Sequence, residues 1–89
     1  MLTLQEISKE MLTLKDWSFE SSSIVKDFSF ANFKEALEFV NKIGEISEKN
    51  NHHPDILITY NFVRVTLTTH SIKGLTPKDF DVAREIDKI

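Results

Sequence analysis

The chain contains three histidines, His52, His53 and His70, whose side chains could carry acid–base chemistry. A free imidazole has a pKa of about 6.5, so it can accept or donate a proton close to neutral pH. The first two histidines are adjacent, in the stretch Asn-His-His-Pro-Asp that ends at Asp55. Because neighbouring side chains on extended backbone point to opposite sides, the pair alone is weak evidence for a site.

A metal site is the main alternative for this set of residues. If the preceding segment is helical, Glu48 lies one turn before His52, and two histidines with a glutamate can bind zinc. The spacing matches no established zinc signature, and both rings of an adjacent pair would reach one ion only through a sharp twist. The chain has no cysteine, which excludes thiolate ligands and a thiol nucleophile. We therefore favour acid–base chemistry without a metal.

The bulk composition excludes several classes of function. Fourteen acidic residues against eleven Lys and Arg give a net charge of −3, and no basic stripe follows the chain. Direct binding of nucleic acid is therefore not expected. The N-terminal segment mixes charged with apolar residues, so we expect neither a signal peptide nor a membrane span. We expect one soluble domain covering residues 1–89, and the absence of cysteine fits the reducing cytoplasm.

The elements that must position the histidines can be read from the apolar pattern. A first helix is expected from Leu4 to Leu12 after Thr3 as its N-cap. Alternating residues on both sides of the serine turn at 21–23 predict a short hairpin. The strongest pattern is an amphipathic helix of about 18 residues after Asn32, which should end near Asn51. Gly44 lies on its apolar stripe and is expected to pack closely against a sheet.

A second hairpin is predicted around Asn61, because β-branched and aromatic residues alternate on both sides of it. Ile56, Ile58 and Tyr60 form one face, and we expect Tyr60 to serve packing rather than catalysis. The last helix should begin with Thr76 as its N-cap, with Pro77 at its first position and Asp79 at its third.

This order of helix, hairpin, helix, hairpin and helix predicts an α+β domain of two layers. A four-stranded antiparallel sheet should carry about three helices on one face, which leaves the other face to solvent or a partner. In a hairpin with its tip at Asn61, the start of one strand lies beside the end of the next. His52 and His53 would precede the third strand and His70 would end the fourth, so all three should meet at one edge of the sheet.

The spacing of Glu48, His52-His53-Pro54, Tyr60, His70 and Asp79 resembles the signature of the pterin-4a-carbinolamine dehydratases, a family also known as the dimerization cofactor of a homeodomain transcription factor. The stretches "YNFVRVTLTTH" and "GLTPKD" are similar to the family's Tyr-Asn, Leu-x-Thr-His and Gly-Leu-Thr segments. Trp17 and "DFSFANFKEALEFV" resemble its N-terminal half, so the likeness covers nearly the whole chain. Ile56 departs from it, because many members have tryptophan there, on one wall of the pterin pocket.

The resemblance implies a reaction and roles for these residues. A 4a-hydroxytetrahydropterin would lose water to give quinonoid dihydropterin, with an acid and a base and with neither a metal nor a cofactor. His52 and His70 would be the acid–base pair, His53 would position the substrate and share in proton transfer, and Pro54 would stiffen the loop. The segment that would contact the pterin a second time comprises Thr69, His70, Ser71 and Ile72.

Two acids receive alternative interpretations. Glu48 either orients His52 or is an exposed acid at a helix end. Asp79 either closes the capping box of the last helix or orients a histidine. The resemblance also implies a homodimer or homotetramer, and it leaves a second hypothesis open: a noncatalytic module that binds a protein partner through a helix or the open sheet face.

Overall fold

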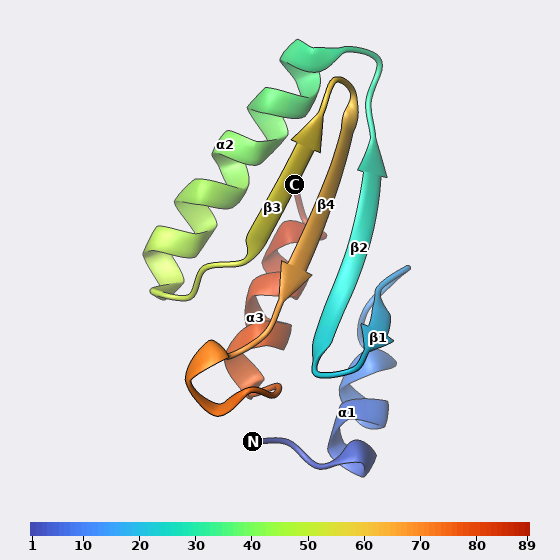
Figure 1. Ribbon diagram of the computed structural model, residues 1–89, viewed down its shortest axis with the longest axis vertical. Coiled ribbons are helices and arrows are strands. Elements are labelled where there is room, and N and C mark those ends of the chain that lie inside the picture. Colours follow the sequence, from blue (N-terminus) through green and yellow to red (C-terminus); the bar gives the residue numbers. More distant parts are fainter.

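Two β-hairpins form one four-stranded antiparallel sheet in the computed structural model, which describes residues 1–89 (Figure 1). The first hairpin consists of β1 (Ser18–Glu20) and β2 (Ser23–Ser29), and the second of β3 (Asp55–Thr59) and β4 (Phe62–Leu67). The hairpins join through β2 and β4, so the strand order is β1-β2-β4-β3. Both predicted hairpins are confirmed.

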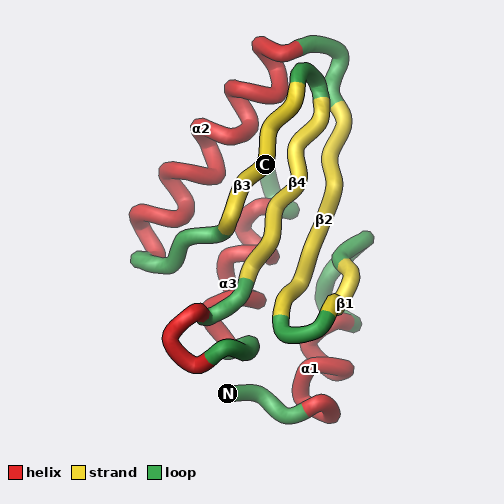
Figure 2. Tube along the Cα trace, viewed as in Figure 1, coloured by secondary structure: helices red, strands yellow, loops and turns green.

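Three helices complete the domain: α1 (Leu4–Met11), α2 (Phe33–Asn50) and α3 (Pro77–Ile86). A short 3-10 turn, η1 (His70–Ile72), lies between β4 and α3. Helices α2 and α3 cover the same face of the sheet, and α1 lies beside β1 (Figure 2). The predicted two-layer α+β architecture is confirmed. None of these helices is both long enough and apolar enough to span a membrane.

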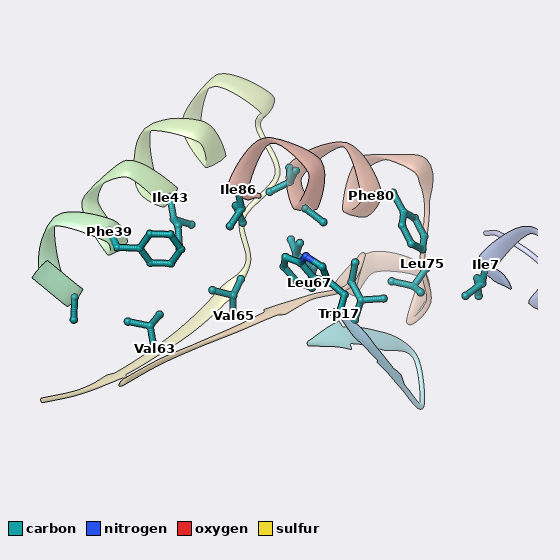
Figure 3. Close-up of a cluster of buried hydrophobic side chains, with 14 residues drawn as sticks. Ile7, Trp17, Phe39, Ile43, Val63, Val65, Leu67, Leu75, Phe80 and Ile86 are labelled. Atoms are coloured by element: carbon teal, nitrogen blue, oxygen red, sulfur yellow. The ribbon is translucent and has the colours of Figure 1, made fainter. Parts of the chain in front are cut away.

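The core fills the space between the sheet and helices α2 and α3 (Figure 3). Strand β4 is central and contributes three fully buried side chains, Val63, Val65 and Leu67, because alternate residues of a strand point to one face. The other buried apolar residues are Ile7, Trp17, Ile24, Ala36, Phe39, Ile43, Leu75, Phe80, Val82, Ala83 and Ile86. Trp17 also donates its indole N–H to the carboxylate of Asp87, which ties the first hairpin to the end of α3.

Side-chain caps fix the helix ends close to the predicted residues. Thr3 begins α1 and forms a reciprocal capping box with Glu6. Asn32 begins α2, where its Oδ1 accepts the amide of Glu35 at 2.9 Å. Asn51 ends that helix in the left-handed conformation with φ 50°. The strand after it can therefore start only a few residues later, which places the two adjacent histidines in the connection.

Two expectations about packing are wrong. A Cβ added to Gly44 would meet no atom within 4 Å, so this glycine does not allow a close approach to the sheet. The face of α2 toward the sheet is narrower than its apolar stripe, and Gly44 lies at its margin. Tyr60 is 68% exposed and has φ 41°. The hairpin turn takes it out of the alternating pattern of β3, so its ring does not join the core.

Candidate active site

Four chain segments meet at one end of the sheet. They are the C-terminal end of α2, the start of β3, the loop that follows β4 and the N-terminus of α3 (Figure 1). The connection between the first two segments carries His52 and His53, the loop carries His70, and the helix N-terminus carries Asp79. The predicted grouping at this edge follows from the antiparallel pairing of β3 with β4, in which Asp55 lies opposite Thr66.

His52 is held against the start of α3. Its backbone amide donates to the carbonyl of Ser47 at 3.1 Å, a bond that closes the last turn of α2 after the left-handed Asn51. Its side chain is only 11% exposed, and Nε2 lies 2.6 Å from Oδ1 of Asp79. This ring is therefore fixed both by its backbone and by a carboxylate.

Asp79 fulfils both roles that the sequence left open. It is fully buried, and its Oδ2 accepts the backbone amide of Thr76 at 3.0 Å, as expected for a capping box. The same oxygen accepts the hydroxyl of Thr69 at 2.8 Å. Its other oxygen faces His52, so one carboxylate joins the helix cap, the loop after β4 and a histidine.

His53 pairs with Glu48, at 2.5 Å between Nε2 and Oε2. Glu48 therefore does not orient His52, and that interpretation is wrong. The reversal of the chain at Asn51 turns the first histidine toward α3 and leaves the second beside the last turn of α2. Both partners of this pair are more than half exposed, at 54% and 79% of their side chains. It is an open, solvated pair.

His70 opens the turn η1, whereas the sequence placed it at the end of β4, which stops at Leu67. The loop is closed by the amide of Thr69, which donates to the carbonyl of Gly74 at 2.9 Å. Nε2 of His70 lies 3.7 Å from Oδ2 of Asp55, and both side chains are mostly exposed. Sequence reasoning missed Asp55, although it directly follows His53-Pro54 and starts the strand beside this loop.

The side chains predicted to contact the substrate after β4 differ in whether they are free to do so. The hydroxyl hydrogen of Thr69 is donated to Asp79, so this side chain is committed to the protein. Ser71 and Ile72 are exposed in η1, and the latter shows 40% of its surface. Pro54 is half-buried and has a trans peptide bond. Ile56 packs against the core.

Each of the three histidines faces a different carboxylate. His52 faces Asp79, His53 faces Glu48 and His70 faces Asp55. No three side chains of His, Cys, Asp or Glu group in a way that could hold a metal ion. The arrangement instead offers three imidazoles, each beside a carboxylate, with one pair buried and two open. Imidazole groups of this kind can act as general acids or bases toward a bound molecule.

Comparisons with known proteins identify the family of the chain. The family model described as pterin 4 alpha carbinolamine dehydratase matches residues 1–89. A relative from Nostoc punctiforme is 47% identical over 100% of this chain and 96% of its own length. Another, from Sulfurisphaera tokodaii, is 46% identical over 99% of this chain and 95% of its own. Both are provisionally named pterin-4-alpha-carbinolamine dehydratases.

Two solved structures share the fold. One is a transcriptional coactivator/pterin dehydratase from Brucella melitensis, which is 34% identical with a TM-score of 0.93 and covers 98% of this chain and 95% of its own. The other is a pterin dehydratase-like RuBisCO assembly factor of the alpha-carboxysome, which at 19% identity and a TM-score of 0.66 shows the fold alone, over 81% of this chain and 83% of its own. The family model over residues 1–89 and the relatives at 46% and 47% identity establish the family. The chain belongs to the pterin 4 alpha carbinolamine dehydratase family.

Proposed function

We propose that the protein dehydrates 4a-hydroxytetrahydropterin to quinonoid dihydropterin and water, in the recycling of a pterin cofactor. In this reaction the bond between C4a and the hydroxyl oxygen breaks. The N5 lone pair forms the new double bond to C4a, and N5 loses its proton to a base. The departing hydroxyl takes a proton from an acid and leaves as water. The steps balance with one acid and one base, and they need no metal or cofactor.

The histidines supply both groups. His52 and His70 form the acid–base pair, and His53 holds the substrate and shares in proton transfer. The segment from Thr69 to Ile72 contacts the pterin through its backbone and through its exposed side chains at Ser71 and Ile72, while Pro54 limits the motion of the loop that presents the adjacent pair. A positioned general acid or base contributes roughly 10²- to 10⁴-fold to a rate.

The observation that carries the proposal is the buried pair of His52 and Asp79, at the end of the sheet where His53 and His70 form open pairs, in a chain that matches the family over its full length. A fixed imidazole next to exposed ones is what a small substrate needs, because one group is preorganised and the others remain accessible. The names of the relatives support the substrate class, because they refer to the same carbinolamine.

An absorbance assay with chemically generated carbinolamine tests the proposal. The purified chain is expected to accelerate the dehydration over the spontaneous reaction. The double variant His52→Ala, His70→Ala should fall back to the spontaneous rate while keeping the native circular dichroism spectrum. The proposal fails if the native chain gives no acceleration or if the folded double variant keeps the native rate. Metal analysis of active protein should show no stoichiometric zinc.

A second function, binding to another protein, is favoured by one observation. Phe33 and Leu37 are 47% and 41% exposed on α2, one turn apart, at the margin of the helix face that packs against the core. Val40 and Gly44 continue this strip, and an added Cβ at the glycine would meet open space. We propose that this strip joins two copies of the chain in a homodimer or homotetramer, and that any further protein partner would compete for it.

A further inference from the structure

The hydrogen bonds to Asp79 all run toward its carboxylate, and this direction determines which ring nitrogen of His52 carries the hydrogen. The residue is fully buried and has three partners: the hydroxyl of Thr69 and the amide of Thr76 on Oδ2, and Nε2 of His52 on Oδ1. The backbone amide can only donate, and an ionised carboxylate can only accept. The Oδ2 position is therefore permanently an acceptor position.

The hydroxyl groups follow the same rule. A hydroxyl has one hydrogen, and that of Thr69 is donated to Asp79. The contact of 2.9 Å between the hydroxyls of Thr69 and Thr76 is then donated by Thr76. The chain of donation thus runs from Thr76 through Thr69 to the carboxylate, and every hydrogen in it points toward Asp79. At Oδ1, which lies 2.6 Å from Nε2 of His52, the ionised carboxylate can likewise only accept, so Nε2 carries the hydrogen of this contact.

The other ring nitrogen of His52 remains available. No hydrogen bond occupies Nδ1, and no buried side-chain nitrogen or oxygen in the structure lacks a partner. Nδ1 therefore reaches solvent, although the side chain is only 11% exposed. In the neutral ring with its hydrogen on Nε2, this exposed nitrogen carries the lone pair.

We propose that Asp79 locks His52 in the Nε2–H tautomer, so that Nδ1 is the atom that exchanges a proton with the pterin. The part that concerns the pterin rests on the proposed function. Asp79 is a positioning residue, because it touches the histidine and not the substrate. Thr69 is a second positioning residue, since its side chain holds Asp79, in contrast to the substrate contact implied by the resemblance.

The variant Asp79→Asn separates this proposal from a purely structural role. The amide of Thr76 still requires an acceptor, so the new side chain must place its carbonyl oxygen there. Its NH₂ group then faces Nε2 of His52 and converts that nitrogen into an acceptor. The hydrogen moves to Nδ1, and the neutral ring adopts the opposite tautomer. The rate should fall roughly 10²- to 10⁴-fold, because Nδ1 can no longer accept a proton.

Long-range ¹H–¹⁵N correlation spectra of the full chain read the tautomer directly, without substrate. His53→Gln and His70→Gln identify the signals of His52 by elimination. We expect the Nε2–H form in the native chain and in the control Glu48→Gln, and the Nδ1–H form in Asp79→Asn. A native His52 in the Nδ1–H form, or as a mixture of tautomers, overturns the proposal. This spectrum is informative even if the native chain shows no dehydratase activity.

The variant Thr69→Val provides the second measurement, and it keeps the test valid if Asp79→Asn does not fold. A positioning role predicts that kcat falls roughly five- to tenfold with little change in KM, because one hydrogen bond to Asp79 is lost. Thr69→Ser should restore kcat, since it restores the hydroxyl. A raised KM with unchanged kcat would show that Thr69 contacts substrate and would overturn its positioning role.

Discussion

Nε2 of His52 lies 2.6 Å from Oδ1 of Asp79, between the end of α2 and the start of α3, and the carboxylate has no contact with solvent. Removing the ring would leave one oxygen of a buried carboxylate without its partner. We expect His52→Ala to lower the free energy of unfolding by about 2 to 3 kcal/mol. Urea denaturation followed by the fluorescence of Trp17, the single tryptophan, measures this loss.

His53→Ala is the matched control for this prediction. It also removes a histidine from a carboxylate pair, but His53 and Glu48 are 54% and 79% exposed. Water replaces the lost partner, so the change should stay within about 0.5 kcal/mol. Equal losses in the two variants would contradict the distinction between a buried and an open pair.

The same pairs predict different kinetic effects at the three histidines. His52→Ala and His70→Ala should each lower kcat roughly 10²- to 10⁴-fold, because each removes one proton-transfer group. His53→Ala should act mainly through a raised KM, since this residue holds the substrate. Steady-state measurements on the folded variants with the carbinolamine distinguish the two effects. A larger loss of kcat in the His53 variant than in the others would reverse the assignment.

The sequence was sufficient for the elements but not for the pairing of side chains. Apolar periodicity and cap residues such as Thr3 and Thr76 are local signals, so they located the helices and hairpins to within a few residues. The partner of His52 depends on how the chain reverses after Asn51, which brings Asp79 from 27 positions away. The left-handed conformation of Asn51 decides whether His52 faces Glu48 or Asp79, and apolar periodicity in the sequence does not encode that conformation.

Burial was equally difficult to predict at the margins of elements. Gly44 and Tyr60 both follow an apolar pattern, but one lies at the edge of a helix face and the other in a turn. Asp55 was missed because it is the first residue of a strand and belongs to no motif of its own. Its relation to His70 arises from the register of β3 and β4, which a single sequence specifies only weakly.

Glu85 predicts part of the acid sensitivity of the fold. Side-chain hydrogen bonds from Lys49 and Asn50 hold the pKa of Glu85 below its usual value of 4.5. Stability from this group is fully present above pH 4.5 and is lost as the pH falls through the lower pKa of the folded state. Because the cluster lies near the surface, the contribution should be at most about 1 kcal/mol.

Denaturation curves at several pH values between neutral and acid test this prediction. Glu85→Gln should be less stable than the native chain at neutral pH, and the difference should shrink as the pH falls below 4.5. Glu45→Gln, which changes an exposed glutamate of α2 that forms no ion pair, is the control and should follow the native curve. A difference that stays constant with pH would show that ionisation of Glu85 makes no contribution.

The exposed strip on α2 predicts self-association. Leu37→Lys places a charge between Phe33 and Val40, and burying that charge in an interface would cost more than the contact provides. Light scattering on size-exclusion fractions should then show a smaller assembly than for the native chain. Leu57→Lys is the matched control, because Leu57 is 51% exposed on the open face of the sheet. If the control dissociates the assembly and Leu37→Lys does not, the sheet face is the interface. A native chain that is monomeric at all concentrations would contradict both.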